Sequence, residues 1–316
     1  MRVLAFLAAA CAAFAATADS RFNGRWDISV PKDPRARAWW LEVAGAGTPD
    51  IAGKFVGAPG GQLDVIPQIS VENGELKFAF LKRYGARAAG EQLNGLYRAR
   101  LVGGKLQGEF EIEGRPESKL EWIGVRAPAI SEKDDGSWKP GHPVELFNGR
   151  DLTGWHSRLP NRETGWRVEN GVLKNNAPAP DLVSDATFWN FALHVEYKVA
   201  EHSNSGIGLR GRYEVQILDD AGKPPSLHGN GALYSRILPS MNASRPAGEW
   251  QSFDIRLVGR QVTVVLNDHK IIDKQTIEGL TAIASDPHEG KPGPFILQGD
   301  HGPVEFRKIV VVPLTR

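Results

Sequence analysis

The chain has 316 residues, and its 38 lysines and arginines balance 37 aspartates and glutamates to a formal net charge of +1. Such a balanced chain lacks the basic surface that nucleic acid or anionic membranes would require, so both partners are excluded. Thirty-five glycines, 21 prolines and no long helical periodicity predict an all-β protein, and the length suggests two domains.

The first eighteen residues have the pattern of a secretory signal. One positive charge, Arg2, precedes an apolar run that ends in the small-residue cleavage pattern Ala16-Thr17-Ala18. The run is too short to span a membrane. We therefore expect a signal peptide over residues 1–18 and an exported protein, either periplasmic or secreted. Cys11 is the only cysteine, so a mature chain without it has no disulfide and no thiolate metal ligand.

Residues 19–127 alternate between apolar and polar side chains in short runs, among them RWDISV, KLQGEFEI and LEWIGV. Asn73-Gly74 and Gly103-Gly104 are the dipeptides that two-residue hairpin turns favour. These features predict a small antiparallel β domain, a barrel or a meander. Residues 128–142 mix proline, glycine and charge, which predicts a linker.

Residues 143–316 contain many short strand-like runs of even spacing, separated by Asn/Gly turns. This pattern predicts a two-sheet β-sandwich or jelly roll. Its most informative stretch is NSGIGLRGRYEVQILDD, which starts at residue 204. Since successive strand residues point to opposite faces, two polar sets are expected on one face. Those sets are Gly206, Gly208 and Arg210 on the first strand, and Glu214 and Gln216 on the second.

Two further strands are expected to bring polar groups to the same concave face. The run HVEYKV places Glu196 and Lys198 on one side, and the run FILQGDH aligns Gln298 with Asp300, followed by His301. Glycines within strands leave the backbone open to a ligand. Together these residues predict a polar groove large enough for a sugar.

Several motifs in the C-terminal half occur in a consistent order: FNGRDLTGW, NSGI-x-LRG, YEVQILDD, HGNGALY, GEW, LND and LQGDHGPVEFRKI. On these motifs, residues 143–313 resemble the 3-keto-disaccharide hydrolase domain family. The resemblance implies a concanavalin A-like, laminin-G-like jelly roll in an exported bacterial protein. The N-terminal domain ends in a W-x-G-x-R-A-P run, Trp122–Pro128, which resembles a small β companion of this domain.

The resemblance implies cleavage of glycosides whose sugar is oxidised to a ketone at C3. The partner would then be a 3-keto oligosaccharide or glycoside. The residues that stand in the family motifs, and to which a site role carries over, are Arg210, Glu214, Gln216, Asp219, His228, Tyr234 and His301.

The chemistry of a 3-keto sugar requires particular groups. The ketone acidifies the proton at C2, so a base can form an enolate and the C1 aglycone can leave by elimination, with water adding later for net hydrolysis. We assign the base to Glu214, whose pKa burial would raise, with His228 as an alternative base or the leaving-group acid and Asp219 as a second carboxylate. Arg210 or His228 would stabilise the enolate. The substrate-binding set comprises Arg210, Gln216, Glu196, Lys198, Tyr234, Gln298 and His301.

Two alternatives remain at the level of sequence. A laminarinase-type retaining glycosidase would use Glu214 and Asp219 as its carboxylate pair if a β-bulge brought both to one face. A carbohydrate-binding module without catalysis would use aromatic platforms, for which Trp155, Trp166, Trp189 and Trp250 are available.

Metal binding is unassigned. Eight histidines are present, but no H-x-H or H-E-x-x-H spacing occurs. The oxygen-rich pairs Asp219-Asp220 and Asn267-Asp268 have no regular calcium-loop pattern around them. We assign no cofactor and leave a divalent cation open.

Overall fold

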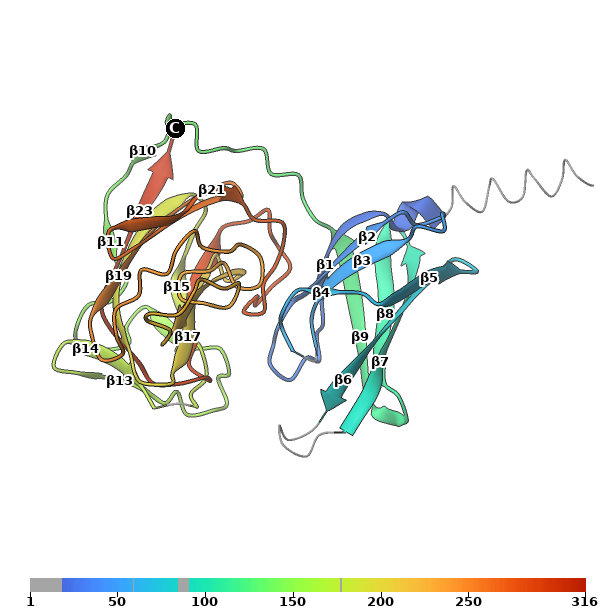
Figure 1. Cartoon of the computed structure of the whole chain (residues 1–316), viewed down its shortest axis with the longest axis horizontal. Helices are drawn as coiled ribbons and strands as arrows, with labels where there is room; N and C mark the ends of the chain where they lie inside the picture. Colours follow the sequence, from blue (N-terminus) through green and yellow to red (C-terminus); the bar gives the residue numbers. More distant parts are fainter. Residues whose placement is uncertain (1–18, 59, 85–90, 177) are drawn as a thin grey trace, which may run out of the picture. The chain divides into compact units, whose positions relative to one another are not determined.

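A computed structural model describes residues 19–58, 60–84, 91–176 and 178–316. The chain divides into two compact units, one ending at Ala127 and the other starting at Pro128 (Figure 1). Within the described ranges the only helical element is a single 3-10 turn, so the predicted all-β class is confirmed. The expected signal peptide with Cys11 lies outside the described residues.

The first unit is a nine-stranded antiparallel sheet. Its elements are η1 (Ser20–Phe22), β1 (Gly24–Ser29), β2 (Trp39–Ala44), β3 (Ala52–Val56), β4 (Asp64–Val65), β5 (Gln68–Glu72), β6 (Glu75–Tyr84), β7 (Glu91–Val102), β8 (Lys105–Ile112) and β9 (Arg115–Arg126). The strand order is β4-β3-β2-β1-β9-β8-β7-β6-β5. Two meanders are thus joined where the first strand pairs with the last.

Two of its hairpins have the turns that the sequence predicts. Asn73 and Gly74 connect β5 to β6 with φ values of 52° and 71°, and Gly103 and Gly104 connect β7 to β8 with 57° and 78°. Positive φ at both central residues matches the right-handed twist of the strands. The predicted antiparallel β domain is confirmed.

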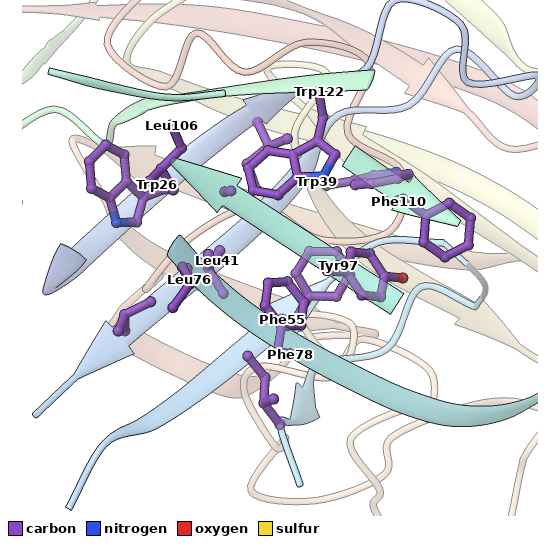
Figure 2. Close-up of a cluster of buried hydrophobic side chains, with 14 of the residues drawn as sticks. Trp26, Trp39, Leu41, Phe55, Leu76, Phe78, Tyr97, Leu106, Phe110 and Trp122 are labelled. Atoms are coloured by element: carbon purple, nitrogen blue, oxygen red, sulfur yellow. The ribbon is translucent and has the colours of Figure 1, made fainter. Parts of the chain in front are cut away.

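The core of this unit is rich in aromatic rings (Figure 2). The ring of Trp39 lies edge-on to Phe55, Tyr97 and Phe110, with centroid distances of 5.8, 6.1 and 5.9 Å. Phe78 stacks on Tyr97 at 4.5 Å. Edge-to-face and offset contacts of this kind add to the stabilisation from apolar burial. The first unit therefore has a core of its own.

The second unit contains two packed sheets. Its strands are β10 (Lys139–Pro140), β11 (Val144–Glu145), β12 (Trp155–Ser157), β13 (Trp166–Glu169), β14 (Val172–Asn175), β15 (Leu182–Phe188), β16 (Phe191–Val199), β17 (Asn204–Leu209), β18 (Tyr213–Leu218), β19 (Gln251–Val258), β20 (Gln261–Leu266), β21 (His269–Thr276), β22 (Gly293–Leu297) and β23 (Val304–Thr315). The larger sheet has the order β13-β14-β23-β16-β19-β20-β21, with β10 and β11 also pairing with β23. The smaller sheet has the order β12-β15-β22-β17-β18.

Neighbouring strands often come from distant parts of the sequence, as where β22 lies between β15 and β17. This is the connectivity of a jelly roll, so the predicted C-terminal sandwich is confirmed. Ile207 and Leu209 of β17 and Val215 and Ile217 of β18 are buried on the inner face. The alternate residues of these strands, Glu214 included, therefore belong to the outer face of the smaller sheet.

Residues of the predicted linker contact the second unit. The Asp134 carboxylate pairs with the Arg256 guanidinium at 2.8 and 3.0 Å, and its backbone N–H donates to Gln261 Oε1 at 2.7 Å. Lys274 Nζ donates to the Asp134 carbonyl at 2.7 Å. The chain from Pro128 onwards is thus attached to the sandwich before β10 begins.

In the part of the chain that the structure describes, no helix has the length and apolar character needed to cross a membrane.

Candidate functional site

The outer face of the smaller sheet carries a buried row that ends at Glu214. The register pairs Val183 with Ile296, Ile296 with Gly208, and Gly208 with Glu214, across four strands. Val183 and Ile296 form an apolar cluster with Ile283, which comes from the loop between β21 and β22. Glu214 therefore lies beside an apolar patch rather than in open solvent.

The adjacent row along the strands is polar. Arg158 follows β12 and its N–H donates to the carbonyl of Asp181, which precedes β15. Next come Gln298, whose N–H donates to the Gly206 carbonyl, and Gln216, which pairs with Gly206. The sheet thus places acidic, amide and guanidinium groups directly beside the row of Glu214.

The Glu214 side chain is buried with one oxygen unsatisfied. The residue is 2% exposed, and Oε2 has no hydrogen-bond partner among the residues that the structure describes. With its amide oriented to face acceptors, Gln216 donates to the Ser205 carbonyl at 3.1 Å and to Glu214 Oε1 at 3.3 Å. A buried carboxyl oxygen without a donor is costly for folding, and such groups are retained where chemistry needs them.

The electrostatic environment favours the protonated form of Glu214. Burial raises its pKa from the usual 4.5 to about 8, and the nearby negative charges of Asp181 and Asp300 add to the increase. The positive charge of Arg158 acts in the opposite direction. A carboxyl group that titrates near neutral pH is suited to general acid–base catalysis.

Arg158 connects the sheet to the loop above it. Its Nη1 pairs with Asp181 Oδ2 at 3.0 Å and donates to the Ile283 carbonyl at 3.1 Å, while Nη2 donates to the Ala284 carbonyl at 3.0 Å. Its side chain is 8% exposed, and burial raises the pKa of Asp181. We name residues 280–286 the covering loop, because Ile283 packs on the buried row.

Sequence reasoning missed Arg158 and Asp181. They lie 23 residues apart, and no motif links them. The sequence offered only a local signal: Arg158 directly follows one strand of the smaller sheet, β12, and Asp181 directly precedes another, β15. Only the pairing of β12 with β15 shows that the two side chains meet.

Tyr234 and His228, which the sequence assigns to the site, lie in the segment after β18. The Tyr234 N–H donates to the Glu214 carbonyl at 2.9 Å. Burial raises the pKa of the half-buried Tyr234 hydroxyl, and the charge of Glu214 adds to this. The exposed His228 ring lies 4.8 Å from the Tyr234 ring, centroid to centroid. The backbone of Tyr234 thus contacts Glu214, and its ring contacts the exposed ring of His228.

Gln298, Asp300 and His301 lie along the same outer face. The Gln298 Oε1 atom is buried and finds no donor within the described ranges. The Asp300 carboxylate contacts His301 Nδ1, and both side chains are partly exposed. Of these three residues, Asp300 and His301 are the ones that are more exposed to solvent.

Arg210 does not join this face, so the predicted alignment with the two glycines is wrong. Strand β17 ends one residue earlier, and Arg210 has a φ of 53°, which breaks the alternation. Its guanidinium donates to the Trp189 and Gly259 carbonyls at 2.5 and 2.8 Å and to Asn190 Oδ1 at 3.1 Å. Burial lowers its pKa to about 10. These contacts give Arg210 a structural role in joining loops.

Glu196 and Lys198 lie on the other sheet, so their predicted place in the groove is wrong. Their alternation along β16 is correct, but they face outwards from the larger sheet. The Glu196 carboxylate contacts the Arg307 guanidinium, and Lys198 Nζ pairs with Glu305 at 2.8 Å. Alternation gives two faces for each strand and cannot tell which sheet the strand joins.

Asp219 is also separated from Glu214. Its Oδ2 accepts the His202 N–H at 2.9 Å in the turn after β18. The β17–β18 pairing runs without a register shift, so residues five apart in β18 and its extension point to opposite faces. The bulge that a laminarinase-type pair requires does not occur there, and the geometry does not support that alternative.

The four tryptophans considered as sugar platforms are engaged in packing. Trp155 and Trp166 are buried, and their indole N–H groups donate to backbone carbonyls at 2.7 and 2.8 Å. Trp189 and Trp250 are half-buried, and each has an arginine guanidinium over its ring. The binding-module alternative therefore gains no support from these rings.

A search of the described residues finds no group of three or more histidine, cysteine, aspartate or glutamate side chains placed to hold a metal ion. The polar groups around Glu214 are instead two carboxylates, two amides, a phenol and a guanidinium.

Comparisons with known proteins agree on one family for the second unit. The sequence model of the 3-keto-alpha-glucoside-1,2-lyase-like domain matches residues 142–312, more than half of the chain. A 3-keto-disaccharide hydrolase of Bacteroides thetaiotaomicron is 25% identical in an alignment 230 positions long, which covers 53% of this chain and 77% of that protein.

Two solved structures from Parabacteroides distasonis, both described as candidate glycosyl hydrolases, are also similar. One is 30% identical, covers 58% of this chain and 91% of its own, and has a TM-score of 0.48. The other is 23% identical, covers 55% and 94%, and has a TM-score of 0.48.

Proposed function

Because this chain belongs to the 3-keto-alpha-glucoside-1,2-lyase-like family, we propose that its second unit cleaves glycosides whose sugar carries a ketone at C3. Family membership identifies a carbohydrate-active enzyme, and the proposal concerns its substrate and chemistry. The observation that carries the proposal is Glu214, a buried carboxyl with an unsatisfied oxygen and a pKa raised by burial to about 8. Such a group is a strong base for a carbon acid.

In the proposed reaction, the Glu214 carboxylate takes the proton from C2, and the C–H electrons form an enolate with the C3 oxygen. The enolate electrons then form a C1–C2 double bond as the C1–O bond breaks, and the aglycone oxygen takes a proton. The products are the free aglycone and an unsaturated 3-keto sugar. Addition of water across the double bond would complete net hydrolysis.

Neighbouring groups have roles that follow from their positions. Tyr234, whose pKa is raised by burial, retains its proton and can donate it to the oxyanion at C3. His228, which is exposed and lies against the Tyr234 ring, would protonate the leaving oxygen. The Gln298 Oε1 and Gln216 amides would bind sugar hydroxyls. Asp219, Arg210, Glu196 and Lys198 have no role in this proposal.

The test is cleavage of oxidised against unoxidised sugars. Purified protein is incubated with 3-keto-trehalose, 3-keto-lactose and the parent disaccharides, and the products are identified by mass spectrometry. The proposal expects cleavage of the keto sugars alone, with a Glu214→Gln variant at least about 100-fold slower, the usual size of a lost acid–base group. Cleavage of the parent sugars, or full activity of the variant, would contradict it.

We also propose that the protein is exported. Support comes from the charge, apolar run and small-residue cleavage pattern of residues 1–18. Mass spectrometry of the protein from its native cells is expected to give an N-terminus at Asp19. A protein that keeps Met1 and is absent from the exported fraction would contradict this.

A further inference from the structure

One cation, Arg158, acts on two carboxyl groups beside the buried row. Arg158 acts electrostatically on both Asp181 and Glu214. It forms an ion pair with Asp181 at 3.0 Å, and it also donates to the carbonyls of Ile283 and Ala284 in the covering loop. Asp181 is held in turn by the Gly299 N–H, which donates to Oδ1 at 3.1 Å. The pair is therefore fixed from both sides.

We propose that Asp181 is a positioning residue that holds Arg158 in its own ion pair and so leaves Glu214 without a cationic partner, as a strong base. The Arg158 charge opposes the effect of burial on the pKa of Asp181, although burial outweighs it and the net shift is upward. Glu214 has no such ion pair, and its Oε2 atom is buried and unsatisfied. The Asp181–Arg158 pair therefore modifies the basicity that burial gives to Glu214.

The groups that face Glu214 allow this effect to be isolated. Asp181 precedes β15, Asp300 follows β22, Arg158 follows β12, and Tyr234 comes from the segment that borders β18. Asp181 is the only one of these four that both repels a negative charge on Glu214 and neutralises Arg158. Its removal therefore acts in one direction, towards an ionised Glu214. Only the rate measurement below depends on the proposed function.

The decisive experiment measures the ionisation of Glu214 directly. Full-length protein labelled with 13C at the glutamate side-chain carboxyl is titrated by NMR, and a Glu214→Gln variant identifies the resonance. Asp181→Asn keeps the volume of the side chain and removes its charge. We expect this substitution to lower the Glu214 pKa by about one to three units, the usual effect of an uncompensated neighbouring cation. An unchanged or raised Glu214 pKa would overturn the proposal.

Two further variants separate charge from loosening of the covering loop. Asp286 pairs with Arg212 at 2.8 Å on the same loop but is absent from the charges that act on Glu214. Asp286→Asn should therefore leave the Glu214 resonance unchanged, and an equal shift would attribute the effect to the loop. The double variant Asp181→Asn/Arg158→Met removes both charges and should restore a pKa near that of the wild type. A persistently low value would overturn the proposal even if the single variant folds poorly.

The rate measurement distinguishes this proposal from the proposed function. If both hold, the pH profile of kcat/KM for a 3-keto glycoside moves with the NMR titration in the Asp181→Asn variant. If the resonance moves while no keto sugar is cleaved, the positioning role stands and the substrate assignment fails. If cleavage occurs with an unmoved resonance, the substrate assignment stands and the positioning role fails.

Discussion

Glu214 is a residue whose burial opposes the stability of the fold. Its folded-state pKa of about 8 lies above the usual 4.5, so the folded protein binds an extra proton between these values. Stability from this group is therefore fully present below about pH 4.5 and is lost as the pH rises to 8. The loss is up to about 5 kcal/mol if the whole shift is realised.

A Glu214→Gln substitution is therefore expected to stabilise the protein at high pH. The amide does not ionise, so the melting temperature of the variant relative to wild type should be higher at pH 8.5 than at pH 5. The exposed Glu145 supplies the control, since Glu145→Gln should show no such difference. Thermal melts at the two pH values measure the effect. If the melting temperatures of the variant and the wild type differ by the same amount at pH 5 and at pH 8.5, Glu214 ionises as it would in water.

Glu214 also predicts the pH dependence of the rate. The free enzyme should lose activity as its base is protonated, so kcat/KM on a 3-keto glycoside should fall about tenfold per pH unit below the Glu214 pKa of about 8. Above that pKa, any further fall reports loss of the proton from the leaving-group acid. Initial rates at low substrate between pH 5.5 and 9 measure this. A profile that is flat from pH 6 to 9 would remove Glu214 from the role of base.

The β17–β18 hairpin shows how far an element can be predicted from sequence. Alternation places Glu214 and Gln216 on one face and the apolar residues between them in the core, as the structure confirms. The alternation fails at Arg210, because β17 ends at Leu209 and Arg210 itself adopts a positive φ. A turn that uses a non-glycine residue at positive φ leaves no clear mark in the sequence.

The two strand glycines of β17 make a matched pair for a prediction. A Cβ on Gly206 would lie 2.6 Å from Glu214 Oε1, the mobile end of a side chain, whereas one on Gly208 would lie 2.9 Å from Ile296 Cβ. Gly206→Ala should therefore displace the carboxylate and lower kcat/KM by about 100-fold, as misplaced catalytic groups do, with little loss of stability. Gly208→Ala should instead cost about 1–3 kcal/mol through overpacking.

Activity assays and denaturant unfolding of the two variants measure this contrast. If Gly206→Ala loses as much stability as Gly208→Ala, the backbone rather than Glu214 has moved. If Gly206→Ala keeps full activity on a 3-keto glycoside, the observed position of the carboxylate is not needed for catalysis.

At the scale of the whole molecule, the sequence predicts the two β units but not which side chains meet. Glu196 and Glu214 follow the same rule of alternation, yet they lie on the outer faces of different sheets. The contact between Arg158 and Asp181 depends on β12 pairing with β15, a non-local choice. Local patterns fix which residues face outwards, whereas the order of strands decides which of them form a site.

The boundary of the second unit yields the last prediction. A fragment that begins at Pro128 keeps the Asp134–Arg256 pair, in which the carboxylate is 7% and the guanidinium 30% exposed, whereas one that begins at Pro143 loses it. Removal of Asp134 leaves the Arg256 charge without its partner, but solvent screens this partly exposed arginine. The free energy of unfolding of the shorter fragment should therefore be about 1–3 kcal/mol lower. For a unit of this size the melting temperature should fall by about 2–12 °C. Asp134→Asn in the longer fragment should reproduce part of the fall. Equal melting of all three proteins would show that residues 128–142 only connect the two units.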